Sequence, residues 1–452
     1  MKEFDVIIIG SGSGLDVASA YTSRGKEVAV VEPGRLGGTC LNRGCIPSKM
    51  LIHHADIVEE IEESENFHIE SEISNINFPA ITSEVNNKVR EESEKIKRSL
   101  KSSDNHTLYT EEAKFVDEKV LEVGEEEITA EKIVIAAGSR PMIPSIDGLD
   151  EVDFLTSKEA LKLDECPESI VMIGGGYISL ELAHFYYRMG VEVTILEMSD
   201  RLLQREDLDI AEKVTELAQD KYNVYTRFGA NKVAEEAGEK VVYAEDKHGV
   251  EHRFIGDEVL VATGRVPNTD RLEVEEAGLE TAEHGFLEVD KYLETNIDGI
   301  YALGDIAGNY MFKHSANLEA EHVFKNSYAG NEYPVDYTAM PHAVFTSPQV
   351  AGVGKTEQEL EEKNEKFVAA AYNYSNTGMG MALKEEDGFV KVIAAPDGEI
   401  LGCHIIGPEA STLIHEVLVA MKSGNKNIKD IKDTVHIHPA LSEVVSRAFQ
   451  QM

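Results

Sequence analysis

Two cysteines near the N-terminus have the spacing of a reactive thiol pair. Cys40 and Cys45 are separated by four residues in the segment 37–49, GGTCLNRGCIPSK, just ahead of a predicted helix. A helix N-terminus lowers the pKa of a nearby thiol and makes its sulfur a better nucleophile, so the pair could open and close a small disulfide ring. The alternatives are two unrelated buried thiols or half of a metal site. No second Cys/His pair has the spacing that would complete a zinc site, so we interpret the pair as a redox centre and predict no metal.

A histidine near the C-terminus is the second candidate. His438 lies in the segment 435–443, VHIHPALSE, which also contains Glu443. A histidine held by a carboxylate can exchange protons near neutral pH. Alone, the segment fits a His-x-His metal-ligand pair or an ordinary surface histidine equally well. A dithiol site needs an acid/base, and for this reason we favour the catalytic interpretation. The remaining cysteines, Cys166 and Cys403, we interpret as buried structural thiols.

Two glycine-rich turns must position dinucleotides beside these groups. Each turn follows a Val/Ile-rich run typical of a buried parallel strand (4–9 and 169–173) and precedes a predicted helix (16–24 and 178–189). The glycines of the turns are Gly10, Gly12 and Gly14 in the first and Gly174 and Gly176 in the second. One such unit is a weak signal, but two in one chain predict tandem dinucleotide-binding domains.

An acidic residue ends the second strand of each unit. Glu32 follows the run 27–31 and Glu197 follows the run 191–196, where an acid accepts hydrogen bonds from adenosine ribose hydroxyls. At Glu197 the acid would repel a 2′-phosphate, so we expect NAD rather than NADP. NADP stays possible, because Arg201 and Arg205 follow closely and could hold a phosphate.

The rest of the chain predicts an α/β protein with two tandem Rossmann-like domains and an α+β C-terminal domain. A charged helical stretch, 48–102, has acidic runs that we interpret as solvated helix faces. Predicted strands at 132–137 and 258–262 close the two units. After a boundary near 331–334 come predicted strands 389–394 and 400–406 and helices 413–423 and 441–449. The expected domains are 1–145 together with 266–332, then 146–265, and last 333–452.

The composition excludes several partners. Among 452 residues, 83 are acidic and 43 basic, giving a net charge of −40, which repels nucleic acid and anionic lipid. Such a charge predicts a protein of a very salty cytoplasm; the alternative is a merely acidic mesophile protein. Four cysteines make no disulfide scaffold. We find no signal peptide and no apolar run near the ~20 residues of a membrane span, so we expect a cytoplasmic protein without membrane partners.

Together these motifs resemble the class I flavoprotein disulfide reductases, the family of dihydrolipoamide dehydrogenase, glutathione reductase, mycothione reductase and mercuric reductase. The resemblance covers essentially the whole chain and implies FAD in the first domain, NAD(P)H in the second, and a homodimer. It implies that Cys45 forms the charge-transfer contact with the flavin and that Cys40 exchanges with substrate. His438 and Glu443 would act on the other subunit's disulfide. The other residues it implies for the site are Lys49 and Glu181 as an ion pair near flavin N5, Tyr177 over the flavin, Asp305 on the ribityl chain, and Gly38, Thr39, Gly138, Gly264, Arg265, Lys313 and His314 around the cofactors.

The sequence departs from the family pattern at Leu15, which replaces the third glycine of the first turn and should loosen the contact between helix and strand. Leu15 and the stretch 313–320 resemble mycothione reductase, whereas Glu197, Met198 and the segment 438–443 fit dihydrolipoamide dehydrogenase better. No cysteine pair stands at the C-terminus, as it would in mercuric reductase or the large thioredoxin reductases.

We therefore predict oxidation of dihydrolipoamide, free or on a lipoyl-bearing protein, by NAD⁺. The alternative is NAD(P)H-dependent reduction of a small-thiol disulfide of the mycothione or bis-γ-glutamylcystine type. A non-catalytic flavin-binding scaffold is disfavoured, because all the reactive residues are present together.

Overall fold

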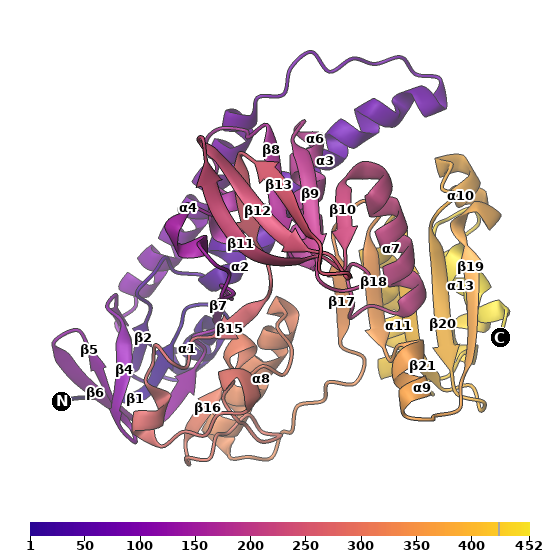
Figure 1. Ribbon diagram of the computed structural model, residues 1–452. Coiled ribbons are helices and arrows are strands. Elements are labelled where there is room, and N and C mark those ends of the chain that lie inside the picture. Colours follow the sequence, from indigo (N-terminus) through magenta and orange to yellow (C-terminus); the bar gives the residue numbers. More distant parts are fainter. Residues whose placement is uncertain (424) are drawn as a thin grey trace.

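The first sheet surrounds the N-terminal strand. The computed structural model describes residues 1–423 and 425–452, and its first sheet has the order β3-β2-β1-β6-β5-β4, with β16 beside β6 (Figure 1). These strands are β1 (Lys2–Ile9), β2 (Val28–Val31), β3 (His106–Tyr109), β4 (Ala113–Asp117), β5 (Val120–Val123), β6 (Glu126–Ile135) and β16 (Ile300–Ala302). Ile8 of β1 pairs with Val30 and Val134 in parallel register and is fully buried. The predicted buried parallel strand at 4–9 is thus confirmed. Helices α1 (Gly14–Thr22) and α8 (Lys313–Ala329) pack against each other beside this sheet.

A second sheet, parallel throughout, repeats the parallel part of the first sheet, β3-β2-β1-β6, which β5 and β4 extend by antiparallel pairing. Its order is β10-β9-β8-β14, and an antiparallel sheet, β11-β12-β13, lies beside it. These strands are β8 (Ser169–Ile173), β9 (Glu192–Glu197), β10 (Asn223–Thr226), β11 (Gly229–Glu236), β12 (Glu239–Glu245), β13 (Glu251–Gly256) and β14 (Glu258–Val261). The helices of this part are α5 (Ser157–Ala160), α6 (Tyr177–Arg188) and α7 (Leu208–Lys221). A short ribbon of β7 (Ser139–Pro141) and β15 (Arg265–Pro267) lies between the two parallel sheets (Figure 1).

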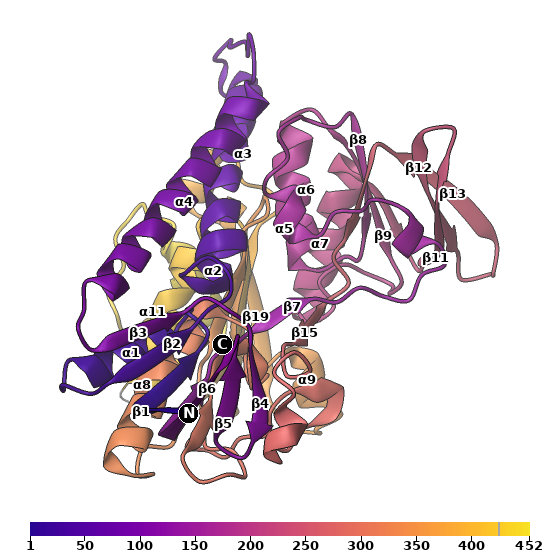
Figure 2. The same ribbon diagram turned by 90° about the vertical axis from the view of Figure 1, so that its left-hand side faces the viewer.

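The charged stretch forms two long helices. After α2 (Gly38–Arg43) come α3 (Cys45–Glu63) and α4 (Phe78–Lys101), which lie side by side and are joined at the end furthest from the first sheet (Figure 2). Most of the acidic run on α3 is solvated, as expected. Glu59 is the exception: its side chain is 13% exposed and pairs with Arg188 of α6. The interpretation of this run as wholly solvated was therefore wrong at Glu59.

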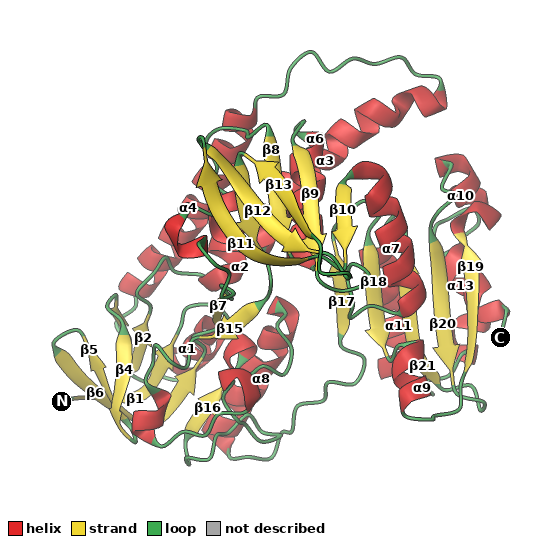
Figure 3. Ribbon diagram, in the orientation of Figure 1, coloured by secondary structure: helices red, strands yellow, loops and turns green. Residues whose placement is uncertain are grey.

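The C-terminal part is an antiparallel sheet of order β17-β18-β21-β20-β19, flanked by helices (Figure 3). Its elements are β17 (Pro341–Val344), β18 (Val350–Gly354), α9 (Glu357–Glu362), β19 (Val368–Asn373), α10 (Gly378–Leu383), β20 (Phe389–Ala394), β21 (Ile400–Ile406), α11 (Ala410–Lys422), α12 (Lys429–Lys432) and α13 (Glu443–Gln450). Short 3-10 turns are η1 (Ser64–Phe67), η2 (Leu149–Glu151), η3 (Val274–Ala277), η4 (Glu283–Gly285), η5 (Gly304–Ile306) and η6 (Tyr374–Asn376). Strands β20 and β21 coincide with the two predicted runs.

A buried lysine joins the C-terminal sheet to the second parallel sheet. The ammonium of Lys391 on β20 lies 2.7 Å from Asp207 Oδ1 and 2.7 Å from Asp209 Oδ2, at the start of α7. The side chain of Lys391 is 4% exposed and that of Asp207 is fully buried. Neither charge could stay buried alone, so the contact fixes α7 against the sheet. None of the described helices is both long and apolar enough to cross a membrane.

Candidate active site

The two cysteines lie where α2 gives way to α3. Cys40 is on α2 and Cys45 is the first residue of α3, and both are free thiols in the structure. Between them Gly44 packs tightly, since a Cβ there would lie 3.1 Å from the Thr39 carbonyl oxygen. A hydrogen bond between the thiols, helped by Lys49 against the effect of burial, lowers the pKa of Cys45 to about 7. The same bond and burial raise the pKa of Cys40. Cys45 is thus the sulfur that ionises first.

The ion pair of Lys49 and Glu181 lies next to the thiols, and Phe345 contacts both of its members. Lys49 Nζ, one turn along α3, lies 2.5 Å from Glu181 Oε2 on α6. Glu181 is 4% exposed, and its Oε1 accepts the backbone N–H of Phe345 at 3.0 Å. The Lys49 ammonium also lies 4.6 Å from the centre of the Phe345 ring. Three segments far apart in the sequence therefore meet at Lys49.

One large cavity, of about 320 Å³, collects most of the predicted residues. It is lined by both thiols and by the first glycine turn, and extends to Glu32. The predicted residues that line it are Gly10, Gly12, Glu32, Gly38, Thr39, Cys40, Cys45, Lys49, Gly138, Tyr177, Glu181, Arg265, Asp305 and Lys313. A cavity that joins a glycine turn to a thiol pair has the composition that a long dinucleotide requires.

The glycines of this cavity fit a closely approaching ligand. At Gly10, where φ is +103°, a Cβ would lie 2.2 Å from the Ala136 carbonyl oxygen. At Gly38, where φ is +66°, a Cβ would lie 2.7 Å from Gly12 Cα. Side chains at these positions would clash with neighbouring backbone, so only glycine allows the chain to pack this closely at the N-terminus of α1, the part of the unit where a pyrophosphate would bind.

The second turn repeats the geometry of the first. Gly10 N–H donates to Val31 O at 2.8 Å and Gly174 N–H donates to Leu196 O at 2.8 Å. A Cβ at Gly174 would lie 2.6 Å from Ala262 O, the counterpart of the contact at Gly10, whereas Gly176 faces open space. Both turns have the backbone geometry that the binding of an anionic dinucleotide requires. Gly264, with φ of +140°, lies two residues beyond Ala262.

Both acidic residues tie their strand to the glycine turn. Glu32 accepts the Ser11 hydroxyl at 2.7 Å and the Gly34 N–H at 2.9 Å. Glu197 accepts the Gly175 N–H at 2.6 Å and the Ser199 N–H at 2.7 Å. Glu32 Oε2 also accepts the Ser11 N–H at 3.1 Å, but Glu32 Oε1 and both oxygens of Glu197 accept only one hydrogen bond each, so both acids can still accept a ribose hydroxyl.

Leu15 does not loosen the first unit, contrary to expectation. Gly14 makes the close contact itself: a Cβ there would lie 2.8 Å from Ile8 Cγ2 and 3.0 Å from Ala136 Cβ. Leu15 packs against the core on one side of the sheet instead. The helix approaches the strand one residue earlier than the usual pattern places it.

Polar groups around Asp305 and Lys313 complete the cavity. Asp305 Oδ2 accepts the Ser139 hydroxyl at 2.5 Å, and Arg265 Nε donates to that same hydroxyl at 2.8 Å. At the start of α8, Lys313 donates to the Ser13 hydroxyl at 2.8 Å and also to Asn317. Ser13 and Asn317 were not among the binding residues predicted from the sequence.

His438 and Glu443 pair with each other outside this cavity. His438 Nδ1 lies 3.0 Å from both oxygens of Glu443, and the imidazole is 74% exposed. His438 holds the pKa of Glu443 below its ordinary value. Neither residue is among those lining the cavity of their own chain. The carboxylate thus orients a ring whose other nitrogen faces outward.

Three predicted residues lie elsewhere. His314 is not among the residues that line the cavity, and its Nε2 lies 2.8 Å from Pro341 O. Cys403 is fully buried, as expected for a structural thiol. Cys166 is exposed, so the expectation that it is buried was wrong.

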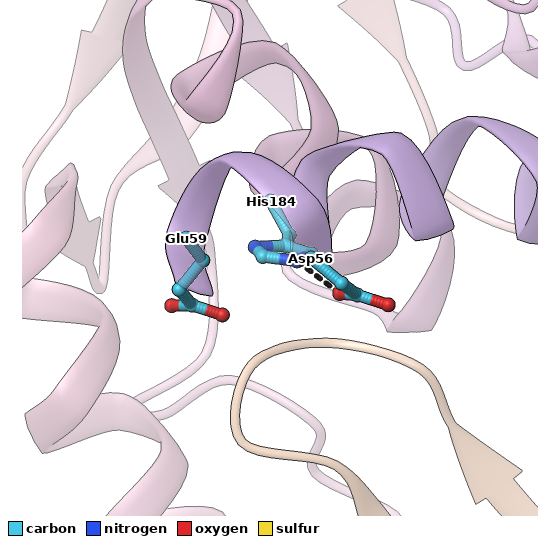
Figure 4. Close-up of side chains that lie close together, drawn as sticks. All are labelled: Asp56, Glu59 and His184. Carbon is cyan, nitrogen blue, oxygen red and sulfur yellow. Dashed lines mark hydrogen bonds and ion pairs between the residues drawn. The ribbon is translucent and has the colours of Figure 1, made fainter. Parts of the chain in front are cut away.

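A carboxylate–histidine cluster lies further along α3. Figure 4 shows the His184 ring between Asp56 and Glu59, with His184 Nε2 2.9 Å from Asp56 Oδ1. Glu59 is already paired with the guanidinium of Arg188 and, at 3.0 Å, with Lys221 Nζ. Two cations on one carboxylate would repel a divalent ion, so the cluster serves as an ion-pair network between α3 and α6.

A fold with two dinucleotide turns and a thiol pair defines an enzyme that moves electrons between a nucleotide cofactor and a sulfur substrate. Residues 4–320 match the family model described as pyridine nucleotide-disulphide oxidoreductase, and residues 340–449 match its dimerisation domain. The chain therefore belongs to the pyridine nucleotide-disulphide oxidoreductase family and is a flavoprotein disulfide oxidoreductase. This family uses FAD and NAD(P)H, as the resemblance implied.

Its relatives carry two different names. The chain is 36% identical to dihydrolipoyl dehydrogenase 3 of Haloarcula marismortui, over 99% of this chain and 96% of the relative. It is 35% identical to mycothione reductase of Mycobacterium tuberculosis, over 99% of both chains. Among solved structures, it is similar to the Cu(II) complex of the HOCl-induced flavoprotein disulfide reductase RclA from Escherichia coli, with a TM-score of 0.88, 27% identity and full coverage of both chains.

Proposed function

We propose that this enzyme oxidises dihydrolipoamide with NAD⁺, forming lipoamide and NADH. The observation that carries the choice of NAD⁺ is the surroundings of Glu197. Arg201 and Arg227, the cations beside the end of β9, both face Asp200, at 2.9 Å and 3.7 Å. Asp200 offsets only one of these two positive charges, and Arg205 is exposed with no ion pair in the described structure. The choice of NAD⁺ therefore depends on Glu197, whose negative charge at the ribose position would repel a 2′-phosphate.

The thiol pair would carry the exchange. A substrate thiolate attacks Cys40 of the Cys40–Cys45 disulfide, and Cys45 leaves as the thiolate favoured by its lowered pKa. The second substrate thiol then attacks the mixed disulfide and releases lipoamide and the Cys40 thiolate, while His438 takes up the proton. FAD held at the first glycine turn would supply the hydride chemistry that connects the thiol pair to NAD⁺. The products are lipoamide, NADH and one proton.

Apart from Gly14, which packs against Ile8, and His314, which contacts Pro341 O, the residues keep the roles predicted from the sequence and from the resemblance. Gly10, Gly12, Glu32, Gly38, Thr39, Gly138, Asp305 and Lys313 hold FAD, and Gly174, Gly176, Glu197 and Gly264 hold NAD⁺. Lys49, Glu181, Tyr177 and Arg265 stand at the junction of the two sites. The proposed FAD domain is 1–145 with 266–332, the NAD domain 146–265 and the dimerisation domain 333–452. His438 and Glu443 would serve the partner's thiols in a homodimer, consistent with their position outside the cavity of their own chain.

A second candidate, reduction of a small-thiol disulfide, is favoured by the start of α8. Lys313, which contacts Ser13 and Asn317, places a cation in the cavity. Lys313 and Asn317 belong to the stretch 313–320 that resembles mycothione reductase. The relative of that name is as similar in sequence as the dihydrolipoyl dehydrogenases.

Steady-state assays distinguish the two candidates. Dihydrolipoamide with NAD⁺ is compared with a panel of disulfides, including mycothione, bis-γ-glutamylcystine and glutathione disulfide, each with NADH and with NADPH at molar salt. We expect the highest kcat/KM for dihydrolipoamide with NAD⁺. A clear preference for NADPH without lipoamide turnover would contradict the proposal and favour the second candidate.

A further inference from the structure

The segment that carries His438 has few attachments of its own. It lies between α12, which ends at Lys432, and α13, which begins at Glu443. Thr434 N–H donates to Ile431 O at 3.1 Å, and the next backbone donor along the chain is Glu443. Val435 and Ile437 are exposed. In the part of the chain that the structure describes, no backbone–backbone hydrogen bond attaches residues 435–438 to the rest of the fold.

His436 is the side chain of this segment that points inward. Its ring is 9% exposed, with Nδ1 3.1 Å from Thr434 O and Nε2 3.1 Å from Glu416 Oε2 on α11. Burial raises the pKa of Glu416, whose Oε1 is buried without a partner in the described structure. Nδ1–H donates to Thr434 O, since a carbonyl oxygen can only accept, and Nε2 contacts Glu416 Oε2, so each ring nitrogen has an oxygen partner. The pair therefore ties the segment to the helix that runs beneath it.

We infer that His436, held by Glu416, is a positioning residue for His438. Glu443, on α13, fixes the imidazole of His438. His436, through its contact with Glu416 on α11, fixes the backbone two residues before His438. A general acid/base must lie within hydrogen-bond reach of the proton it moves. The inference rests on the proposed function, since it assigns a task to the residue that serves the thiol exchange there.

Half-reactions of the FAD-loaded full chain test this inference. Wild type, His436→Leu and His436→Gln are compared in stopped-flow measurements of flavin reduction by saturating NADH and of thiol–disulfide exchange with lipoamide. We expect His436→Leu to slow exchange about tenfold or more, because misplacing a reacting group by an ångström has effects of that size. Flavin reduction should stay unchanged, and His436→Gln, which keeps an N–H donor toward Glu416, should recover part of the loss.

The control is His248→Leu, the same substitution at an exposed histidine on the turn between β12 and β13; it should leave exchange unchanged. Equal slowing of both half-reactions, or no slowing of exchange, in His436→Leu would overturn the inference. If wild type exchanges with no disulfide or dithiol, the proposed function fails instead. Amide hydrogen exchange at residues 435–437 then tests whether His436 holds this segment against α11. Faster amide exchange in His436→Leu supports the inference, and unchanged amide exchange overturns it.

Discussion

Lys49 and Glu181 join the helix that begins with Cys45 to the helix that begins with Tyr177, through a 2.5 Å contact between Nζ and Oε2. The two charges act on Cys45 in opposite directions: the ammonium lowers its pKa and the carboxylate raises it. The pair therefore sets how readily the thiolate forms, in addition to holding α3 against α6.

Single substitutions in this pair should move the pKa of Cys45 in opposite directions. Lys49→Met removes the positive charge and should raise this pKa above its value of about 7. Glu181→Gln removes the negative charge and should lower it. The measurement is the thiolate absorbance near 240 nm as a function of pH in the reduced enzyme, with Cys40→Ser and Cys45→Ser variants to assign the signal. Shifts of the same sign in both variants would refute the electrostatic account.

The two sulfurs should differ in their effect on the flavin spectrum. Anaerobic addition of one equivalent of NADH to wild type should give the long-wave thiolate–flavin band of this enzyme class. Cys45→Ser should abolish the band with FAD still bound, because the thiolate of lowered pKa is lost. Cys40→Ser should keep the band and lose exchange with substrate. A band that survives in Cys45→Ser would reverse the assignment of the sulfurs.

Complementation tests whether His438 serves the thiols of a partner chain. Homodimers of Cys45→Ser and of His438→Gln should each have little activity. After unfolding and refolding as a mixture, heterodimers should contain one intact site, giving about a quarter of the wild-type activity at equal mixing if the dimer is a symmetric pair. A mixture that stays as inactive as its components would show that thiols and histidine act within one chain.

Glu59 should make stability depend on acid pH. Burial alone would raise the pKa of Glu59, but Lys221, Ser347, His184 and Arg188 together lower it from 4.5 to about 2. The ionised Glu59 therefore contributes on the order of 3 kcal/mol to the free energy of unfolding. This contribution is fully present above pH 4.5 and is lost as the pH falls toward 2. The advantage of wild type over Glu59→Gln in the denaturant midpoint should shrink over this range.

The control for Glu59 is its exposed neighbour Glu60, for which the structure gives no ion pair. Glu60→Gln should leave the midpoint unchanged at every pH. A constant difference between wild type and Glu59→Gln from pH 6 to pH 3 would show that the ion pairs of Glu59 do not couple to folding.

The net charge of −40 should make stability rise with salt. Counter-ions shorten the range of repulsion from about 10 Å at 0.1 M to about 3 Å at 1 M. We expect the melting temperature to increase from about 0.1 to 2 M KCl, the range over which this screening acts. Sucrose at equal osmolality, which stabilises without screening charge, is the control. A melting temperature independent of KCl would contradict the interpretation of the acidic surface as an adaptation to salt.

Local pattern predicted the elements that carry the glycine turns. The run 169–173 coincides with β8. A short Val/Ile-rich run is typical of a strand buried on both faces, and this local signal does not depend on distant parts of the chain. The thiol motif was likewise visible, since its residues are close in sequence. Gly14 shows the limit even there: the spacing identified Leu15 as a departure but did not show that the helix packs through the residue before it.

Contacts between distant segments had no signal in the sequence. Phe345 donates to Glu181 across 164 positions, and nothing in the pattern around 341–348 indicates that partner. The burial of Glu59 was missed for the same reason, because its acidic run is typical of a solvated face until Arg188 and Lys221 are brought against it. Such pairs depend on how whole domains pack, which one sequence does not reveal by periodicity.

The reach of Phe345 into its own chain's thiol site has a consequence for biosynthesis. The glycine turns, both cysteines and α6 leave the ribosome well before residue 345. Lys49 and Glu181 can therefore meet before Phe345 is there to contact them. During synthesis there is thus a period in which the thiols and both glycine turns are present while the contacts of Phe345 are still missing. The last quarter of the polypeptide, which supplies the dimerisation domain, also completes the reactive centre of the subunit to which it belongs.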